Sequence, residues 1–155
     1  MFPEELNKEY MKIKETNPTF DWWSYMNFSF SSLDALAFLR FFNPEMIEKD
    51  GCYFLKDGAS HSSYKTWKEE LGDDLTSIEK LINLYEPYDF FSTRDMQLDQ
   101  FDDDEWESVF DHFSEGLQAQ WQMSLNARYP DIPFKVDLFE EHDNVYLTVY
   151  VKRET

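Results

Sequence analysis

The segment from Leu98 to Arg128 reads LDQFDDDEWESVFDHFSEGLQAQWQMSLNAR and contains the strongest amphipathic pattern in the chain. Large apolar side chains recur in it every three or four residues and so share one stripe of an α-helix. They are Trp106, Phe110, Phe113, Leu117, Trp121 and Leu125. Asp102, Asp103 or Asp104 can supply the N-cap, and more carboxylates follow where the helix dipole favours negative charge. The segment therefore predicts a long helix that begins near these aspartates and rests its aromatic stripe on other elements.

Shorter helices are predicted from the same kind of periodicity and from capping signals. They cover residues 4–15, 33–42, 63–71 and 73–85. The helix over 33–42 is apolar nearly all round, so we expect it to be central and covered. The aromatic segment 20–30 fits neither helix nor strand periodicity. We expect an extended stretch or an irregular loop there, with its rings packed around the N-terminal helix rather than forming a binding surface.

The strand signals are fewer and shorter. Residues 52–55 predict a strand between two turns, and residues 44–49 a short turn before it. Apolar side chains alternate over 134–138 and again over 145–151, which predicts a C-terminal hairpin with a loop at 140–144. We expect these strands to form one small sheet of three or four strands. The fold class is α+β: a single domain over residues 1–155, with four to five helices on a small, mainly antiparallel sheet.

The chain is strongly acidic, with 32 acidic and 14 basic residues and a net charge of −18. Eleven acidic residues and one basic residue, Arg94, lie between Glu86 and Glu115. A field of this sign repels phosphates and anionic membranes, so we expect neither nucleic acid nor membrane as a partner. It attracts a basic protein or a cation, although it also serves solubility. The sequence has one cysteine and no apolar signal segment, which predicts a cytoplasmic protein.

No pattern of a catalytic, cofactor or metal site fits the sequence. The aspartate cluster lacks the glycine of a calcium loop, and His61, His112 and His142 are too scattered for zinc. Glycine-rich phosphate loops and nucleophile elbows are also missing. Cys52, on a short predicted strand, is expected to be a small buried side chain rather than a nucleophile. We therefore predict no catalytic residue, no cofactor and no metal ligand.

On this basis we expect a non-catalytic acidic domain that binds a basic protein. Inhibitors of nucleases, immunity-type proteins and mimics of nucleic acid have this property. The candidate contact residues are Asp99, Phe101, Asp102, Asp103, Asp104, Glu105, Trp106, Glu107 and Asp111, with Phe101 or Trp106 as an apolar anchor. Two alternatives stay open: a structural or oligomerising module that uses the aromatic segment 20–30 or an exposed sheet edge, and an enzyme with a carboxylate site that no motif reveals.

Overall fold

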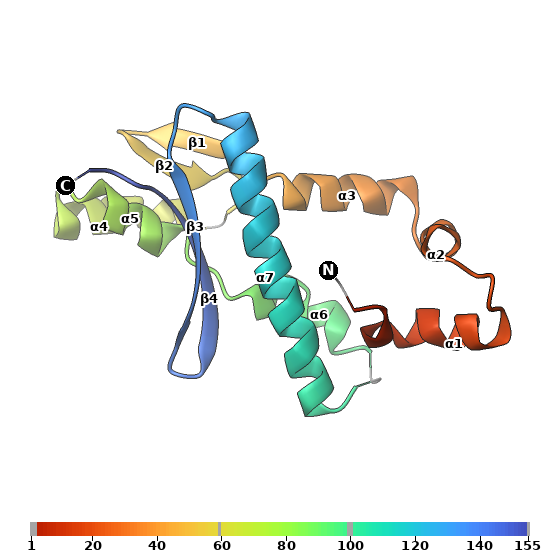
Figure 1. Ribbon diagram of the computed structural model, residues 1–155. Helices are drawn as coiled ribbons and strands as arrows, with labels where there is room; N and C mark the ends of the chain where they lie inside the picture. The colour runs from red at the N-terminus through yellow and green to blue at the C-terminus, as the bar shows by residue number, and fades with distance from the viewer. Residues whose placement is uncertain (1–2, 59, 99–100, 155) are drawn as a thin grey trace.

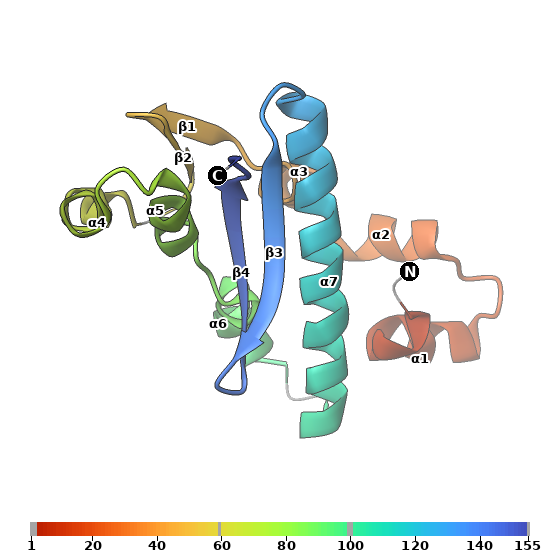
Figure 2. The ribbon, with the colours of Figure 1, turned by 60° about the vertical axis from the view of Figure 1, so that its left-hand side comes forward.

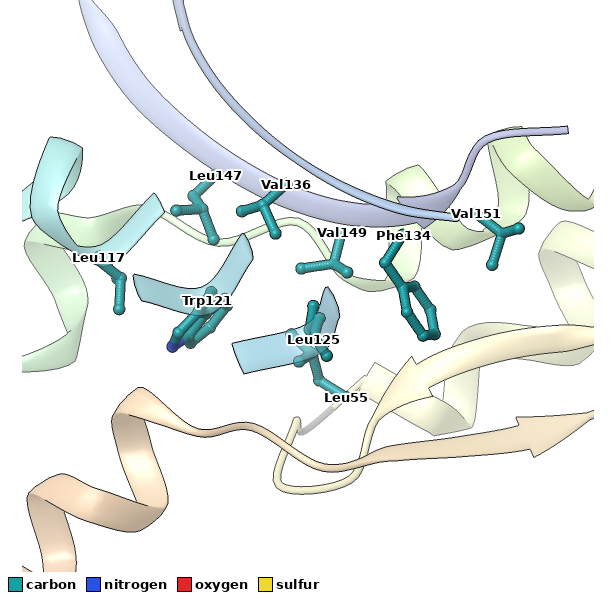
Figure 3. Packing of buried hydrophobic residues seen from close by; sticks show 9 residues of the cluster. All are labelled: Leu55, Leu117, Trp121, Leu125, Phe134, Val136, Leu147, Val149 and Val151. Carbon is teal, nitrogen blue, oxygen red and sulfur yellow. The ribbon is translucent and has the colours of Figure 1, made fainter. Parts of the chain in front are cut away.

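A long helix packed against a β-hairpin forms the centre of the fold (Figures 1 and 2). The computed structural model describes residues 3–58, 60–98 and 101–154. The helix is α7 (Asp103–Arg128), and the hairpin pairs β3 (Phe134–Glu141) with β4 (Asn144–Val151). The stripe of α7 turns Leu117, Trp121 and Leu125 into the main apolar core, against the inward-facing side chains of the hairpin (Figure 3). The predicted helix and the packing of its apolar stripe on other elements are confirmed, and the C-terminal half of the stripe packs on the hairpin.

The hairpin turn is tighter than the sequence pattern indicated. The strands extend to Glu141 and Asn144, so only His142 and Asp143 form the loop. Both loop residues have positive φ, 52° and 64°. This is the conformation of a two-residue turn whose twist matches that of the flanking strands. The predicted loop at 140–144 was too long because polar residues continue into the paired part of both strands.

A second pair of strands lies beside the hairpin. β1 (Met46–Lys49) pairs antiparallel with β2 (Cys52–Leu55) through a turn at Asp50 and Gly51, which have φ of 52° and 81°. The strand at 52–55 is confirmed, but the expected turn over 44–49 is wrong. An aspartate followed by glycine is a strong hairpin signal, and β1 is mostly exposed, so it lacks the alternation that reveals a strand.

Two helices cover this strand pair. They are α4 (Tyr64–Leu71), which follows a 3-10 turn η2 (Ser60–Ser63), and α5 (Leu75–Ile82). Cys52, Phe54, Tyr64, Ile78 and Ile82 form a second apolar cluster between them. Gly72 ends α4 with φ of 60°, a positive value that glycine adopts without strain.

The four strands of the described residues are antiparallel, as expected, but they form two sheets instead of one. The reason is that polar side chains of α5 bond to the edges of β2 and β4 that face each other. The Asn83 side chain, at the end of α5, accepts a hydrogen bond from the Leu55 N–H and donates to the carbonyls of Tyr53 and Val149. One amide therefore takes the place of strand-to-strand bonds and keeps β2 and β4 apart.

Glu79, one turn earlier on α5, makes a second link of this kind. Its fully buried carboxylate accepts from the N–H groups of Tyr53 and Val151, both at 2.8 Å. Arg153 binds the same carboxylate through both terminal nitrogens, at 2.7 and 2.9 Å. The guanidinium also donates to the carbonyl of Gly51. The periodic pattern that predicted α5 gave no sign that this acidic residue faces inward.

The free edge of the hairpin is covered by α7. Gln122 accepts a hydrogen bond from the Val136 N–H and donates to the Phe134 carbonyl, both at 2.8 Å. Gln118 donates to the Val136 carbonyl. Side-chain amides of the helix thus satisfy backbone groups of β3 that would otherwise be open to another strand.

The N-terminal quarter of the chain extends away from this body on the far side of α7 from the hairpin (Figures 1 and 2). It comprises a 3-10 turn η1 (Glu4–Leu6), α1 (Lys8–Thr16), α2 (Trp22–Ser29) and α3 (Ser32–Phe42). We call this part the N-terminal arm. The segment 20–30 is thus largely helical, and the expectation of an extended or irregular segment is wrong. Asp21 caps α2 by accepting from the Ser24 N–H, a local signal that outweighs the poor periodicity.

The helix α3 is exposed rather than central, which corrects a second expectation. It begins at Ser32 and ends at Phe42, close to the predicted range 33–42, and Ser31 and Asp34 form a capping box at its start. However, none of its residues is buried. Only its inner side approaches the body, where Phe41 contacts Phe90, Phe113 and Trp121. Although α3 is apolar nearly all round, the rest of the described chain packs against only one of its sides.

The segment between α5 and α7 shows no clear hydrophobic periodicity in the sequence. It nevertheless contains short helical turns. They are η3 (Pro87–Phe90) and α6 (Ser92–Asp95). Helix α5 ends at Ile82, earlier than predicted, and Tyr85 instead forms a β-bridge with Leu147. Within the described ranges, no helix has both the length and the apolar character needed to cross a membrane.

Candidate functional site

Two of the carboxylates at the start of α7 have structural roles, and two others are exposed. Asp102 accepts from the Glu105 N–H at 2.9 Å, and the Glu105 carboxylate accepts from the Asp102 N–H at 3.0 Å. Glu105 also binds Lys8 of α1 at 2.8 Å, and these bonds hold the pKa of its carboxyl below the ordinary value. Asp102 and Glu105 thus stabilise the helix start and attach the N-terminal arm. Asp103 and Asp104 are exposed on the same turn, and Asp99 lies outside the described residues.

The two predicted aromatic anchors face the N-terminal arm. The rings of Phe101 and Trp106 contact each other edge to face, with centroids 4.9 Å apart. Lys8 places its ammonium 4.8 Å from the centre of the Phe101 ring. Both rings are half-buried and line a shallow hollow together with Leu6 and Tyr25. Their geometry is that of packing between α7 and the arm.

Glu107 and Asp111, one turn apart on α7, line an open groove of about 620 Å³. The groove lies between η3, the N-terminal half of α7 and the tip of the hairpin, which meet at the same end of the molecule (Figure 2). Six carboxylates from these three segments border it. They are Glu86, Asp89, Glu107, Asp111, Glu140 and Asp143. We call this feature the acidic groove.

The backbone fixes the three sides of the acidic groove. Tyr85 and Leu147 exchange two backbone hydrogen bonds of 2.8 Å, which hold the start of η3 against β4. The next residue, Glu86, therefore lies beside the hairpin. The tight turn at His142 places Asp143 at the tip, and the packing of α7 on β3 presents Glu107 and Asp111 from the other side.

The acidic groove is not neutralised by the protein itself. None of its described lining residues is a lysine, arginine or histidine, and in the described ranges its six carboxylates form no salt bridge. Elsewhere, carboxylates such as Glu45, Asp57 and Glu79 are paired with a cation. Negative charges that converge on a concave surface reinforce one another and concentrate cations there.

Aromatic rings form part of the wall of the acidic groove. Tyr88 of η3 is half exposed, and its ring centroid lies 4.9 Å from that of Phe110 on α7. Phe110 in turn stacks on Trp106 at 5.5 Å. An exposed aromatic face beside carboxylates suits an arginine or lysine side chain, which gains both a salt bridge and a cation–π contact.

Groups with catalytic potential lie elsewhere. Cys52 is fully buried on β2, as predicted, and burial raises the pKa of its thiol to about 11. A thiol with that pKa is a poor nucleophile at neutral pH. His112 is exposed, with one ring nitrogen 2.8 Å from the Ser108 carbonyl. Among the described residues, no three or more histidine, cysteine or acidic side chains are placed to hold a metal ion.

The sequence located the acidic groove only in part. Of the predicted contact residues, Glu107 and Asp111 border it. Glu86 and Asp89 lie in the acidic stretch from Glu86 to Glu115 but were not singled out. Glu140 and Asp143 carried only a weak signal, a polar hairpin loop. Comparison with known proteins finds no family model, no curated protein and no solved structure that matches the chain.

Proposed function

We propose that this chain is a non-catalytic acidic binding protein whose acidic groove receives a basic segment of a partner protein. The observation that carries the proposal is the convergence of six unpaired carboxylates from three separate segments on one open groove. A flexible chain rich in lysine and arginine matches this surface, because its ammonium and guanidinium groups reach carboxylates several ångströms apart. The exposed ring of Tyr88 adds a contact for a guanidinium plane.

An inhibitor or immunity-type role in the cytoplasm is the form of this function that we favour. Enzymes that act on nucleic acid have basic clefts, and an acidic protein can occupy such a cleft in place of the substrate. Electrostatic attraction also speeds the encounter of the two proteins, which suits a protein that must neutralise a harmful partner before it acts.

The first experiment measures binding of a fluorescent peptide of ten alternating lysine and arginine residues. The groove variant Glu107→Gln/Asp111→Asn is compared with Asp103→Asn/Asp104→Asn, which removes the same charge from the same helix outside the groove. We expect the groove variant to bind roughly 10-fold more weakly at 50 mM salt, and the control variant to lose no more than about 2-fold. Equal losses would mean that net charge, and not the acidic groove, drives binding, and would return Asp103 and Asp104 to the site.

A second experiment searches for the natural partner. The tagged protein and the groove variant serve as parallel baits in the native lysate at low salt, and a specific partner is one captured by the first and lost by the second. Its affinity should fall steeply as salt rises, because contacts between exposed charges are screened. If the captured protein binds nucleic acid, competition between nucleic acid and this chain distinguishes a mimic from a binder at another surface.

A further inference from the structure

The helices α2 and α3 carry five large apolar side chains that are more than half exposed. Trp23 and Phe28 of α2 are 84% and 81% exposed, and Leu33, Leu36 and Leu39 of α3 are 79%, 61% and 59% exposed. We call these five residues the α2–α3 apolar surface. The less exposed rings nearby face inward instead: Trp22 contacts Tyr10, Phe30 contacts Tyr25 and Phe38 contacts Phe91.

The size of this surface is that of one half of a protein interface. Its side chains expose about 600 Å² of apolar area, if a whole aromatic side chain has ~150–250 Å² and a leucine somewhat less. A specific interface buries roughly 1,200–2,000 Å² in total, or about 600–1,000 Å² on each partner. The largest apolar patch of a typical monomer measures about 300–600 Å². The α2–α3 apolar surface therefore reaches the area that each partner of a small, specific interface buries.

The charge around this surface selects the kind of partner. Residues 17–44 carry only Asp21, Asp34 and Arg40, a net charge of −1 in a chain of −18. Arg40, the one cation, is held by Asp57 through its Nε at 2.9 Å. A basic partner finds here only two carboxylates that already cap helices, and an anionic membrane finds only a cation that is already paired with Asp57. A second apolar surface of low charge fits, and another copy of the chain supplies one.

The leucines of α3 also have the symmetry of a helix that pairs with itself. Leu33, Leu36 and Leu39 follow one another at intervals of three, so they form a stripe on one side of α3. Phe41 holds the opposite side against Phe90 and Trp121. If two copies of α3 pack antiparallel about a twofold axis through Leu36, Leu33 of each copy faces Leu39 of the other.

We propose that a second copy of this chain covers the α2–α3 apolar surface, and that α3 packs antiparallel against its equivalent in a symmetric dimer. The dimer leaves the acidic groove free, because the groove is built from η3, α7 and the hairpin and shares no residue with this surface. The inference therefore stands independently of the partner proposed above. The contact is apolar, so it persists at high salt, whereas binding to the acidic groove weakens.

Sedimentation velocity from 1 to 200 μM at 0.5 M salt tests the proposal. The wild type should sediment with twice the monomer mass of 18.7 kDa. Leu36→Glu should weaken the dimer roughly 100-fold or more, because each copy then buries an unpaired carboxylate. Met123→Glu, which changes an exposed residue of α7, should leave the dimer intact. Circular dichroism checks that both variants keep the fold. A wild-type monomer at every concentration, or a Leu36→Glu dimer of unchanged affinity, overturns the proposal.

A disulfide experiment tests the symmetry. The native thiol, Cys52, is buried, so a cysteine introduced at an exposed position is the one that reacts. Leu36→Cys should form a disulfide-linked dimer rapidly under mild oxidation, and Met123→Cys should not. Equal rates for the two variants would overturn the twofold arrangement. The alternative occupant of this surface is a lipid membrane, and flotation with neutral and with anionic vesicles tests it. A monomer that floats with vesicles would assign this surface to lipid and refute the dimer.

Discussion

Replacement of Glu79 by glutamine is the sharpest test of how the two sheets are held together. In the wild type, each carboxylate oxygen of Glu79 accepts one backbone N–H and one N–H of Arg153. Glutamine has nearly the same shape, so the change creates no cavity. It replaces one of the two oxygens by an NH₂ group, which meets two donors where it needs acceptors. It also leaves the partly buried guanidinium of Arg153 without its counter-charge.

The expected loss of stability follows from these contacts. A buried donor left without an acceptor costs about 1–3 kcal/mol. Removal of one member of a buried ion pair costs about 3–5 kcal/mol. These effects overlap, because the same side chain causes both, so we expect Glu79→Gln to lower the free energy of unfolding by about 3–4 kcal/mol. A loss of this size is a large fraction of the ~5–15 kcal/mol that holds a typical domain together.

Urea denaturation followed by tryptophan fluorescence measures the effect, with the core residue Trp121 among the reporters. With a slope of about 2 kcal/mol per molar urea, the midpoint should fall by about 1.5–2 M. The exposed residue Glu69 on α4 provides the control, since Glu69→Gln should change stability by no more than about 0.5 kcal/mol. A loss below about 1 kcal/mol for Glu79→Gln, with an unchanged slope, would refute the role given to this carboxylate.

Three further predictions concern other parts of the fold. Gln122→Leu should lower the free energy of unfolding by about 1–3 kcal/mol in urea denaturation, because it removes both hydrogen bonds between the side-chain amide and β3. A change near zero would mean that water replaces these hydrogen bonds. Cys52 should resist a thiol reagent at pH 8 in the native protein and react fully in denaturant, and rapid native labelling would contradict its burial. Burial and a hydrogen bond to Asp137 raise the pKa of Tyr150 to about 12, above ~10 in the unfolded chain. Tyr150 therefore stabilises the fold fully below pH ~10. This stabilisation is lost as the pH rises towards ~12, because the phenol ionises first in the unfolded chain. In urea midpoints measured from pH 9 to 12, Tyr150→Phe should therefore show a smaller loss of stability than the wild type.

Elements whose causes are local could be predicted from the sequence. The stripe of α7 repeats through its whole length, and its cap at Asp102 depends only on residues within the first turn. The capping box at Ser31 and the turn at Gly72 are local in the same way. The mixed α+β class follows from such elements, and it is confirmed.

Contacts between distant residues could not be predicted from the same patterns. Nothing near Glu79 in the sequence indicates that Arg153, 74 residues later, enters the fold to bind it. The periodic pattern that predicts a helix here rests on its apolar residues, so it says nothing about the inward position of Glu79 and Asn83. Their inward position decides whether the strands join, and for that reason the number of sheets was predicted wrongly.

The exposure of α3 shows a different limit of the sequence pattern. An all-round apolar helix was expected to be covered on every side, and the pattern does not say by what. Phe41 and Phe42 turn towards the body of the chain, whereas Leu33 and Leu36 do not. Composition therefore predicts that the apolar faces of α3 pack against other residues. Only the fold shows that the described part of this chain leaves one of these faces exposed.

The acidic groove combines both kinds of information. Capping explains Asp102 and Glu105 without any partner, which removes these two carboxylates from the candidate contact residues. Capping does not explain Glu107 and Asp111, which the fold sets opposite the hairpin tip. Like charges gathered on one concave surface repel one another, and this repulsion costs stability while the groove is empty. Under the proposed function, a cationic segment that enters the groove would relieve this repulsion and gain its own salt bridges, so binding and stabilisation would arise from the same charges. Solubility alone requires no such convergence, because charges scattered over the surface serve it equally well.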